Sequence, residues 1–104
     1  MVIEITDSNY SQLVSEGKPL IIDFNAEWCG PCRKMGPILE KLADEYDGQV
    51  IIGSCNVDDN EELPVKFGVM SIPAIFFIKG GEVADKTVGA VPAATIEQKL
   101  KALL

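Results

Sequence analysis

The spacing of hydrophobic residues along the chain changes repeatedly, and each change predicts a secondary-structure element. Near-continuous apolar runs typical of buried strands alternate with stretches in which apolar residues recur at helical spacing. Gly80-Gly81 separates two extended runs and predicts a two-residue hairpin. The predicted order is strand, helix, strand, helix, strand, helix, strand, strand, helix. These elements are expected at residues 3–5, 10–14, 20–24, 31–46, 50–57, 63–67, 74–78, 82–88 and from residue 92 onwards.

This order predicts an α/β sandwich around a mixed sheet. Early strands that are joined by helices pair in parallel, whereas the turn at Gly80-Gly81 imposes an antiparallel edge. Thr6, Asp7 and Ser8 are candidate N-caps for the helix that follows them. The 104 residues suffice for one domain, so we expect a single domain spanning 1–104.

The charge of the chain argues against two classes of partner. Nine basic and sixteen acidic residues give a net charge of −7, which disfavours nucleic acid and anionic membrane surfaces. No apolar run approaches the roughly 20 residues of a membrane-spanning helix, and the first residues lack the pattern of a signal peptide. We therefore expect a cytoplasmic monomer.

The three cysteines indicate redox or metal chemistry. Cys29 and Cys32 are spaced C-x-x-C where a buried strand gives way to a helix. A zinc site needs four ligands, but the chain has no histidine and only one further cysteine, Cys55. Redox chemistry is thus favoured and no metal site is expected. Cys55 lies in an apolar strand and is expected to be a small buried hydrophobic residue, with a regulatory thiol as the alternative.

The position of each cysteine suggests a different role. Cys29 should lie at the helix N-terminus, where unpaired N–H groups and the helix dipole favour the attacking thiolate. Cys32, one turn further, is expected to be less exposed and to resolve the mixed disulfide. Asp23 lies among apolar residues and should be buried. We interpret Asp23 as a proton acceptor for Cys32, the alternative being a strand-end acid capped by local N–H groups.

Residues 23–32, DFNAEWCGPC, resemble the active-site signature of the thioredoxin family. The Gly-Pro pair between the cysteines is typical of the family's reductants, whereas oxidases of this fold usually carry a histidine there. The resemblance continues at Pro37, Glu45-Tyr46, Asn56-Val57-Asp58, Ile72-Pro73, Gly80-Gly81 and Gly89.

The resemblance implies a thioredoxin fold, with a mixed central β-sheet flanked by helices on both faces. It also implies a protein-disulfide reductase in which Cys29 is the nucleophile and Cys32 the resolving thiol. A flavin-dependent thioredoxin reductase would restore the dithiol, and the chain itself would hold no cofactor, since it lacks G-x-G-x-x-G and P-loop motifs. An oxidase or isomerase, and a binding module without turnover, are the alternatives.

The family also implies a docking face around the disulfide. Pro73 would be a cis-proline that presents the backbone of Ile72 to a substrate strand. The implied docking face consists of Trp28, Gly30, Pro31, Ile72, Pro73, Gly89 and Ala90.

Two residues depart from the family pattern near Asp23. Asn25 stands where the family often has a second tryptophan, and Ser54 where it often has a lysine that pairs with the buried acid. Without that cation, the burial of Asp23 is less compensated. We therefore predict that the pKa of Asp23 lies above its unfolded value of about 3.9.

Overall fold

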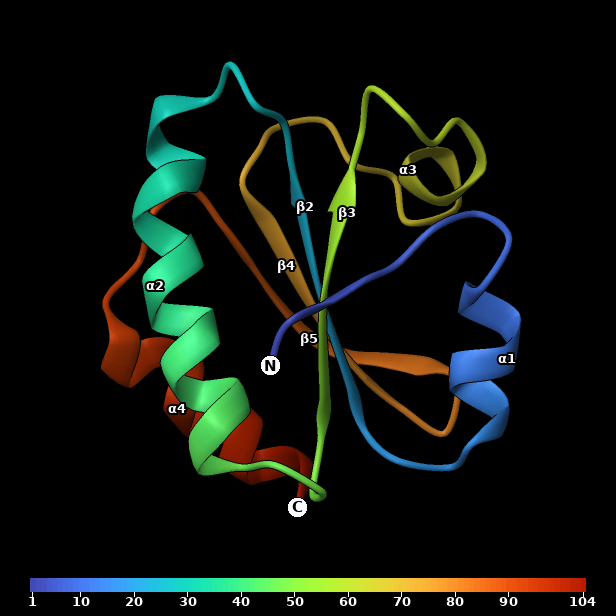
Figure 1. Ribbon diagram of the computed structural model, residues 1–104, viewed down its shortest axis with the longest axis vertical. Coiled ribbons are helices and arrows are strands. Elements are labelled where there is room, and N and C mark those ends of the chain that lie inside the picture. Colours follow the sequence, from blue (N-terminus) through green and yellow to red (C-terminus); the bar gives the residue numbers. More distant parts are fainter.

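The computed structural model describes all 104 residues, and its elements follow the predicted order (Figure 1). The strands are β1 (Ile3–Glu4), β2 (Leu20–Asn25), β3 (Ile51–Asn56), β4 (Ala74–Lys79) and β5 (Glu82–Val88). The helices are α1 (Tyr10–Ser15), α2 (Gly30–Glu45), α3 (Glu62–Lys66) and α4 (Ala93–Leu103). No helix combines the length and the apolar character needed to cross a membrane.

The five strands form one mixed sheet with β2 at its centre. The strand order is β1-β3-β2-β4-β5. β3 pairs in parallel with β1 and with β2, whereas β4 is antiparallel to both β2 and β5. The sheet is therefore mixed, as predicted, and its central strand leads directly into the helix that begins at the cysteine pair.

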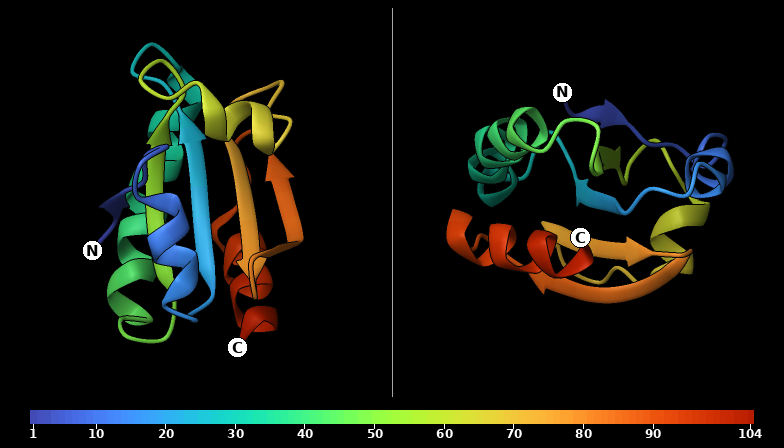
Figure 2. Two further views of the ribbon diagram at one scale, coloured as in Figure 1. Left: turned by 90° about the vertical axis from the view of Figure 1, so that its right-hand side faces the viewer. Right: turned by 90° about the horizontal axis from the view of Figure 1, so that it is seen from below.

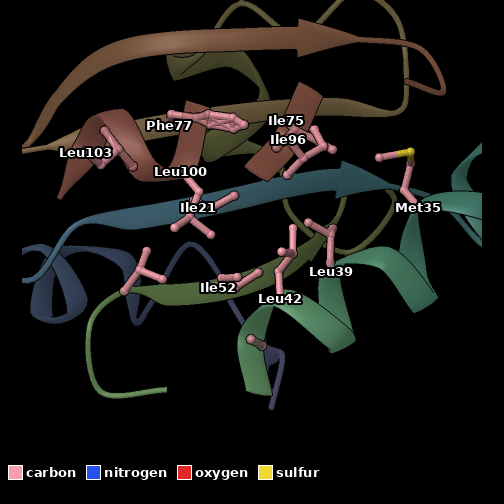
Figure 3. Packing of buried hydrophobic residues seen from close by; sticks show 12 residues of the cluster. Ile21, Met35, Leu39, Leu42, Ile52, Ile75, Phe77, Ile96, Leu100 and Leu103 are labelled. Carbon is pink, nitrogen blue, oxygen red and sulfur yellow. The ribbon is translucent and has the colours of Figure 1, made fainter. Parts of the chain in front are cut away.

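Helices cover both faces of the sheet, α2 and α4 on one side and α1 and α3 on the other (Figures 1 and 2). Side chains of β2 alternate between the two faces. Ile21 packs with residues of α2 and α4 in a cluster that we call the α2–α4 core (Figure 3). Leu20, Ile22 and Phe24 belong to the opposite cluster, the α1–α3 core. This arrangement confirms the predicted thioredoxin-type architecture.

The starts of α1 and α3 differ from what the sequence predicts. The N-cap of α1 is Asn9 rather than Thr6, Asp7 or Ser8, and its side chain makes no capping hydrogen bond. Asp7 instead accepts hydrogen bonds of 3.0, 3.1 and 2.9 Å from the backbone N–H groups at 61–63, where α3 begins. Burial alone would raise the pKa of Asp7, but these three donors together lower it. The side chain thus caps a helix that is distant in sequence.

Candidate active site

The cysteine pair forms a disulfide at the junction of β2 and α2. Cys29 is the N-cap of α2 and Pro31 lies in the first turn, where its missing N–H leaves no helical bond unmade. The Cα atoms of Cys29 and Cys32 are 5.3 Å apart, well within the range that a disulfide spans. The backbone N–H of Cys32 donates to Cys29 Sγ at 3.3 Å. A backbone donor at the start of α2 is thus directed at Cys29 Sγ.

The two cysteines are equally buried, which contradicts the expectation that Cys32 is less exposed. Cys29 is 4% exposed and Cys32 is 6% exposed. The reason lies in what covers each residue. The half-buried Ile72 packs against the cysteine cluster, and its carbonyl oxygen lies 3.9 Å from Cys29 Sγ. Cys32, by contrast, lines a cavity to which neither Cys29 nor Ile72 contributes.

The segments expected to dock a substrate lie around the disulfide. The Ile72-Pro73 peptide bond is cis, as predicted. The N–H of Gly89 donates to the carbonyl oxygen of Pro73 at 2.8 Å, which brings the Gly89-Ala90 segment beside the cis-proline. Gly89 adopts a φ of +85°, in the left-handed region that favours glycine. Gly30, Pro31 and Ala90 are exposed, Ile72 and Gly89 are half-buried, and Pro73 is buried.

Trp28 lies on the surface next to the disulfide and has a fixed orientation. Trp28 is 68% exposed, so a large apolar surface faces solvent. The indole Nε1 donates to Asp58 Oδ2 at 2.9 Å. Nothing in the sequence predicts a role for Asp58 at the site beyond its place in the run Asn56-Val57-Asp58, which resembles the family.

Asp23 lies on the face of the sheet that α2 covers, and it is only 4% exposed. Burial raises the pKa of its carboxyl to about 6, although a hydrogen bond from Asn25 acts in the opposite direction. The prediction of a raised pKa is thus confirmed. Asn25 Nδ2 donates to Oδ2 at 3.2 Å, while Oδ1 is buried without a partner. No backbone N–H group donates to the Asp23 carboxylate, so the alternative interpretation of a locally capped acid is wrong.

Asn25 and Ser54 form a polar pair beside this carboxylate. Asn25 Nδ2 donates to Ser54 Oγ at 2.5 Å, and the serine side chain makes no hydrogen bond to Asp23, its register partner on β2. The sequence analysis noted both residues only as departures from the family pattern. The two-residue period of β2 could have placed Asn25 on the same face as Asp23.

A cavity of about 450 Å³ is lined by residues of the sheet and of α2. Asp23 and Cys32 both line it, together with Asn25 and Ser54 from the sheet. Arg33 and Glu40 of α2 and Glu27 of the preceding loop complete its charged wall. Asp23 and Cys32 thus face one shared space.

Cys55 belongs to the core on the opposite face of the sheet from Asp23. It is fully buried in the α1–α3 core, which confirms the prediction of a small buried hydrophobic residue. Burial is the main cause that raises its pKa to about 11, and the charges of Asp7 and Glu4 add to the effect. The thiolate is thus strongly disfavoured. No three cysteine, aspartate or glutamate side chains converge in a way that could hold a metal ion.

Comparisons with known proteins agree with this geometry. The sequence profile of the Thioredoxin family matches residues 1–102. The chain is 44% identical to a thioredoxin of Chlorobaculum thiosulfatiphilum over 98 residues, which are 93% of this chain and 91% of the relative. It is 46% identical to a thioredoxin of Haemophilus influenzae over 92 residues, 88% and 86% of the two chains. A thioredoxin of Alicyclobacillus acidocaldarius is 40% identical over 100 residues, 96% and 95% of the two chains.

Proposed function

This chain belongs to the thioredoxin family, and from that premise we propose how its residues divide the reaction. The chain is a thiol–disulfide oxidoreductase that reduces protein disulfides, with Cys29 and Cys32 as its redox-active pair. The observation that carries our assignment of roles is the position of Cys29 as the N-cap of α2 with the Cys32 N–H directed at its sulfur.

In the reduced protein, Cys29 is the nucleophile. The helix N-terminus and the N–H of Cys32 stabilise its thiolate. The thiolate attacks one sulfur of a target disulfide, and the other target sulfur leaves as a thiolate, so that a mixed disulfide through Cys29 remains. Cys32 then loses its proton and attacks Cys29 Sγ. The Cys29–Cys32 disulfide forms, the second target sulfur is released as a thiolate, and two electrons have passed to the target.

Asp23 is the acceptor of the proton from Cys32. Both residues line the same cavity, and the acid has a free buried oxygen. Burial raises the pKa of Asp23 to about 6, so the carboxylate is largely ionised at pH 7 and still a useful base. This pKa is well matched to proton transfer near neutral pH.

The docking face places the target disulfide over Cys29. Its residues are Trp28, Gly30, Pro31, Ile72, Pro73, Gly89 and Ala90. The backbone of Ile72 lies against the nucleophile and can pair with an extended target segment. The bond from Trp28 to Asp58 restrains the indole, which reduces the entropy lost on docking.

The partners and the location follow from the need to restore the dithiol. A thioredoxin reductase supplies two electrons to the Cys29–Cys32 disulfide after each turnover. A reducing cytoplasm is the compartment in which such a pair cycles. We propose that the chain acts there as a single-domain monomer, and its net charge of −7 supports solubility without nucleic-acid or membrane partners.

Trapping with single-cysteine variants tests this division of roles. Reduced Cys32→Ser should accumulate mixed disulfides with a model substrate such as insulin, because no resolving thiol remains. Cys29→Ser should not accumulate them, and Cys55→Ala should turn over like the wild type. Equal trapping by Cys29→Ser and Cys32→Ser would contradict the assignment.

The same assay separates the alternative functions. A binding module would show no catalysed reduction by the wild type. An oxidase or isomerase would have a reduction potential well above that of the family's reductants, measured by equilibration with a glutathione buffer.

A further inference from the structure

We propose that Asn25 is a positioning residue that anchors Oδ2 of Asp23 and leaves Oδ1 as the oxygen that receives the proton of Cys32. This inference rests on the proposed role of Asp23 as the proton acceptor. It adds a residue that touches neither the target nor the sulfurs, and it assigns different roles to the two oxygens of one carboxylate.

The geometry of the amide supports the anchoring role. Asp23 and Asn25 are two residues apart on β2, so their side chains share a face of the sheet. Asn25 Nδ2 lies 3.2 Å from Asp23 Oδ2 and 3.1 Å from the carbonyl oxygen of Asp23. It also donates to Ser54 Oγ on β3, at a distance of 2.5 Å. The amide nitrogen is thus held between two strands.

The chemistry of the partners determines which way the amide faces. An ionised carboxylate only accepts hydrogen bonds, so the nitrogen of the amide must point at Oδ2. The opposite orientation would place two acceptors together. This interaction therefore favours ionised Asp23 over its protonated form.

The two oxygens of Asp23 consequently differ in basicity. Oδ2 shares its charge with a donor, whereas Oδ1 is buried without any partner and retains the stronger attraction for a proton. When Oδ1 takes the proton, Oδ2 becomes a carbonyl oxygen and still accepts from Asn25. The anchor therefore holds throughout the transfer, and only one oxygen changes its state.

The other charged groups around the carboxylate do not provide this function. Arg33 and Glu40 of α2 and Glu27 of the loop line the same cavity. Glu4 lies on β1, so β3 with Ser54 stands between it and Asp23. None of them makes a hydrogen bond or an ion pair with Asp23. Asn25 is the one side chain that contacts the carboxylate through a hydrogen bond.

Titration of Asp23 in Asn25→Ala tests the inference directly. Carbon-13 NMR of the Asp23 carboxyl in the oxidised protein should show a titration midpoint roughly one pH unit higher than in the wild type, the size expected for one lost charge-assisted hydrogen bond. Ser54→Ala should give a smaller rise, because the amide keeps its contact with Oδ2. Asn25→Leu, similar in size but without a donor, should reproduce the rise if Asn25→Ala folds poorly.

Kinetics then link the anchor to the reaction. The acidic limb of the pH–rate profile for insulin reduction should move to higher pH in Asn25→Ala, and this movement should vanish in an Asp23→Asn background. An unchanged NMR midpoint in both Asn25 variants would overturn the inference while leaving Asp23 as the base. A shifted midpoint combined with an Asp23→Asn variant of unchanged rate would instead overturn the base role, and with it the assignment of Oδ1.

Discussion

Replacing Asp23 with asparagine should raise the free energy of unfolding near neutral pH while slowing disulfide reduction. Asp23 is 4% exposed, and its Oδ1 has no hydrogen-bond partner. The ionised carboxylate is therefore a cost to the folded state that the neutral amide does not carry. The same substitution removes the proposed proton acceptor for Cys32, so stability and activity should change in opposite directions.

The magnitude follows from the two pKa values. Burial raises the pKa of folded Asp23 to about 6, and the unfolded value is about 3.9. Each pH unit between them corresponds to about 1.36 kcal/mol, so the full effect is about 3 kcal/mol. Below the unfolded pKa both states are protonated and there is no cost. Between the two values the folded state binds more protons, so the free energy of unfolding falls as pH rises. Above the folded pKa the cost is complete.

Denaturant unfolding of the oxidised wild type and variant, across pH 3 to 8, measures this effect. Other groups titrate in both proteins and cancel in the difference between them. The stability advantage of Asp23→Asn should grow by about 3 kcal/mol from acid to neutral pH. If the new amide packs better or worse than the carboxyl, the free energy of unfolding changes by the same amount at every pH. The pH dependence of the difference between the two proteins is therefore unaffected. A difference that stays flat with pH would refute the reasoning, because it would mean that Asp23 is ionised in the folded state without cost.

Further predictions concern the cysteines and the cap of α3. Alkylation of the reduced protein at neutral pH should label Cys29 before Cys32, because Cys29 lies at the helix N-terminus; mass mapping that finds Cys32 labelled first would contradict this. Cys55 should stay unlabelled in the folded protein. Cys55→Ser should lower the free energy of unfolding by about 1–3 kcal/mol relative to the wild type, because a hydroxyl is buried there without a matched partner; a serine variant as stable as the wild type would argue against this. Asp7→Asn should lower the thermal midpoint at pH 7 because α3 loses an ionised cap. That deficit should shrink as pH falls through the lowered pKa of Asp7, and a deficit independent of pH would exclude the charge as its cause.

Features set by neighbouring residues could be predicted from the sequence. The order of strands and helices follows from local apolar spacing, and the C-x-x-C pair follows from its place between a buried strand and a helix. The burial of Asp23 and of Cys55 follows in the same way from the apolar strands that contain them. Each of these predictions depends only on a few neighbouring residues in the sequence.

Features set by contacts between distant segments could not be predicted. The sequence does not reveal that β3 lies between β1 and β2, since the pairing of strands depends on the whole chain. Nor does it reveal that Asp7 caps a helix that begins more than fifty residues later. The prediction that Cys32 is less exposed than Cys29 is wrong, because Ile72, far along the chain, covers Cys29.

The buried residues around the sulfurs form a small cluster of their own. Its members are Ala26, Cys29 and Cys32, and the half-buried Val57 and Ile72 pack both against it and against the α1–α3 core. Substitutions in this cluster therefore leave the large side chains of the two cores in place. Gly30 and Pro31 lie between the two cysteines, are exposed and belong to neither core. A library randomised at positions 30 and 31 should accordingly yield folded variants whose reduction potentials differ, so the surroundings of the sulfurs can change on a scaffold that stays the same.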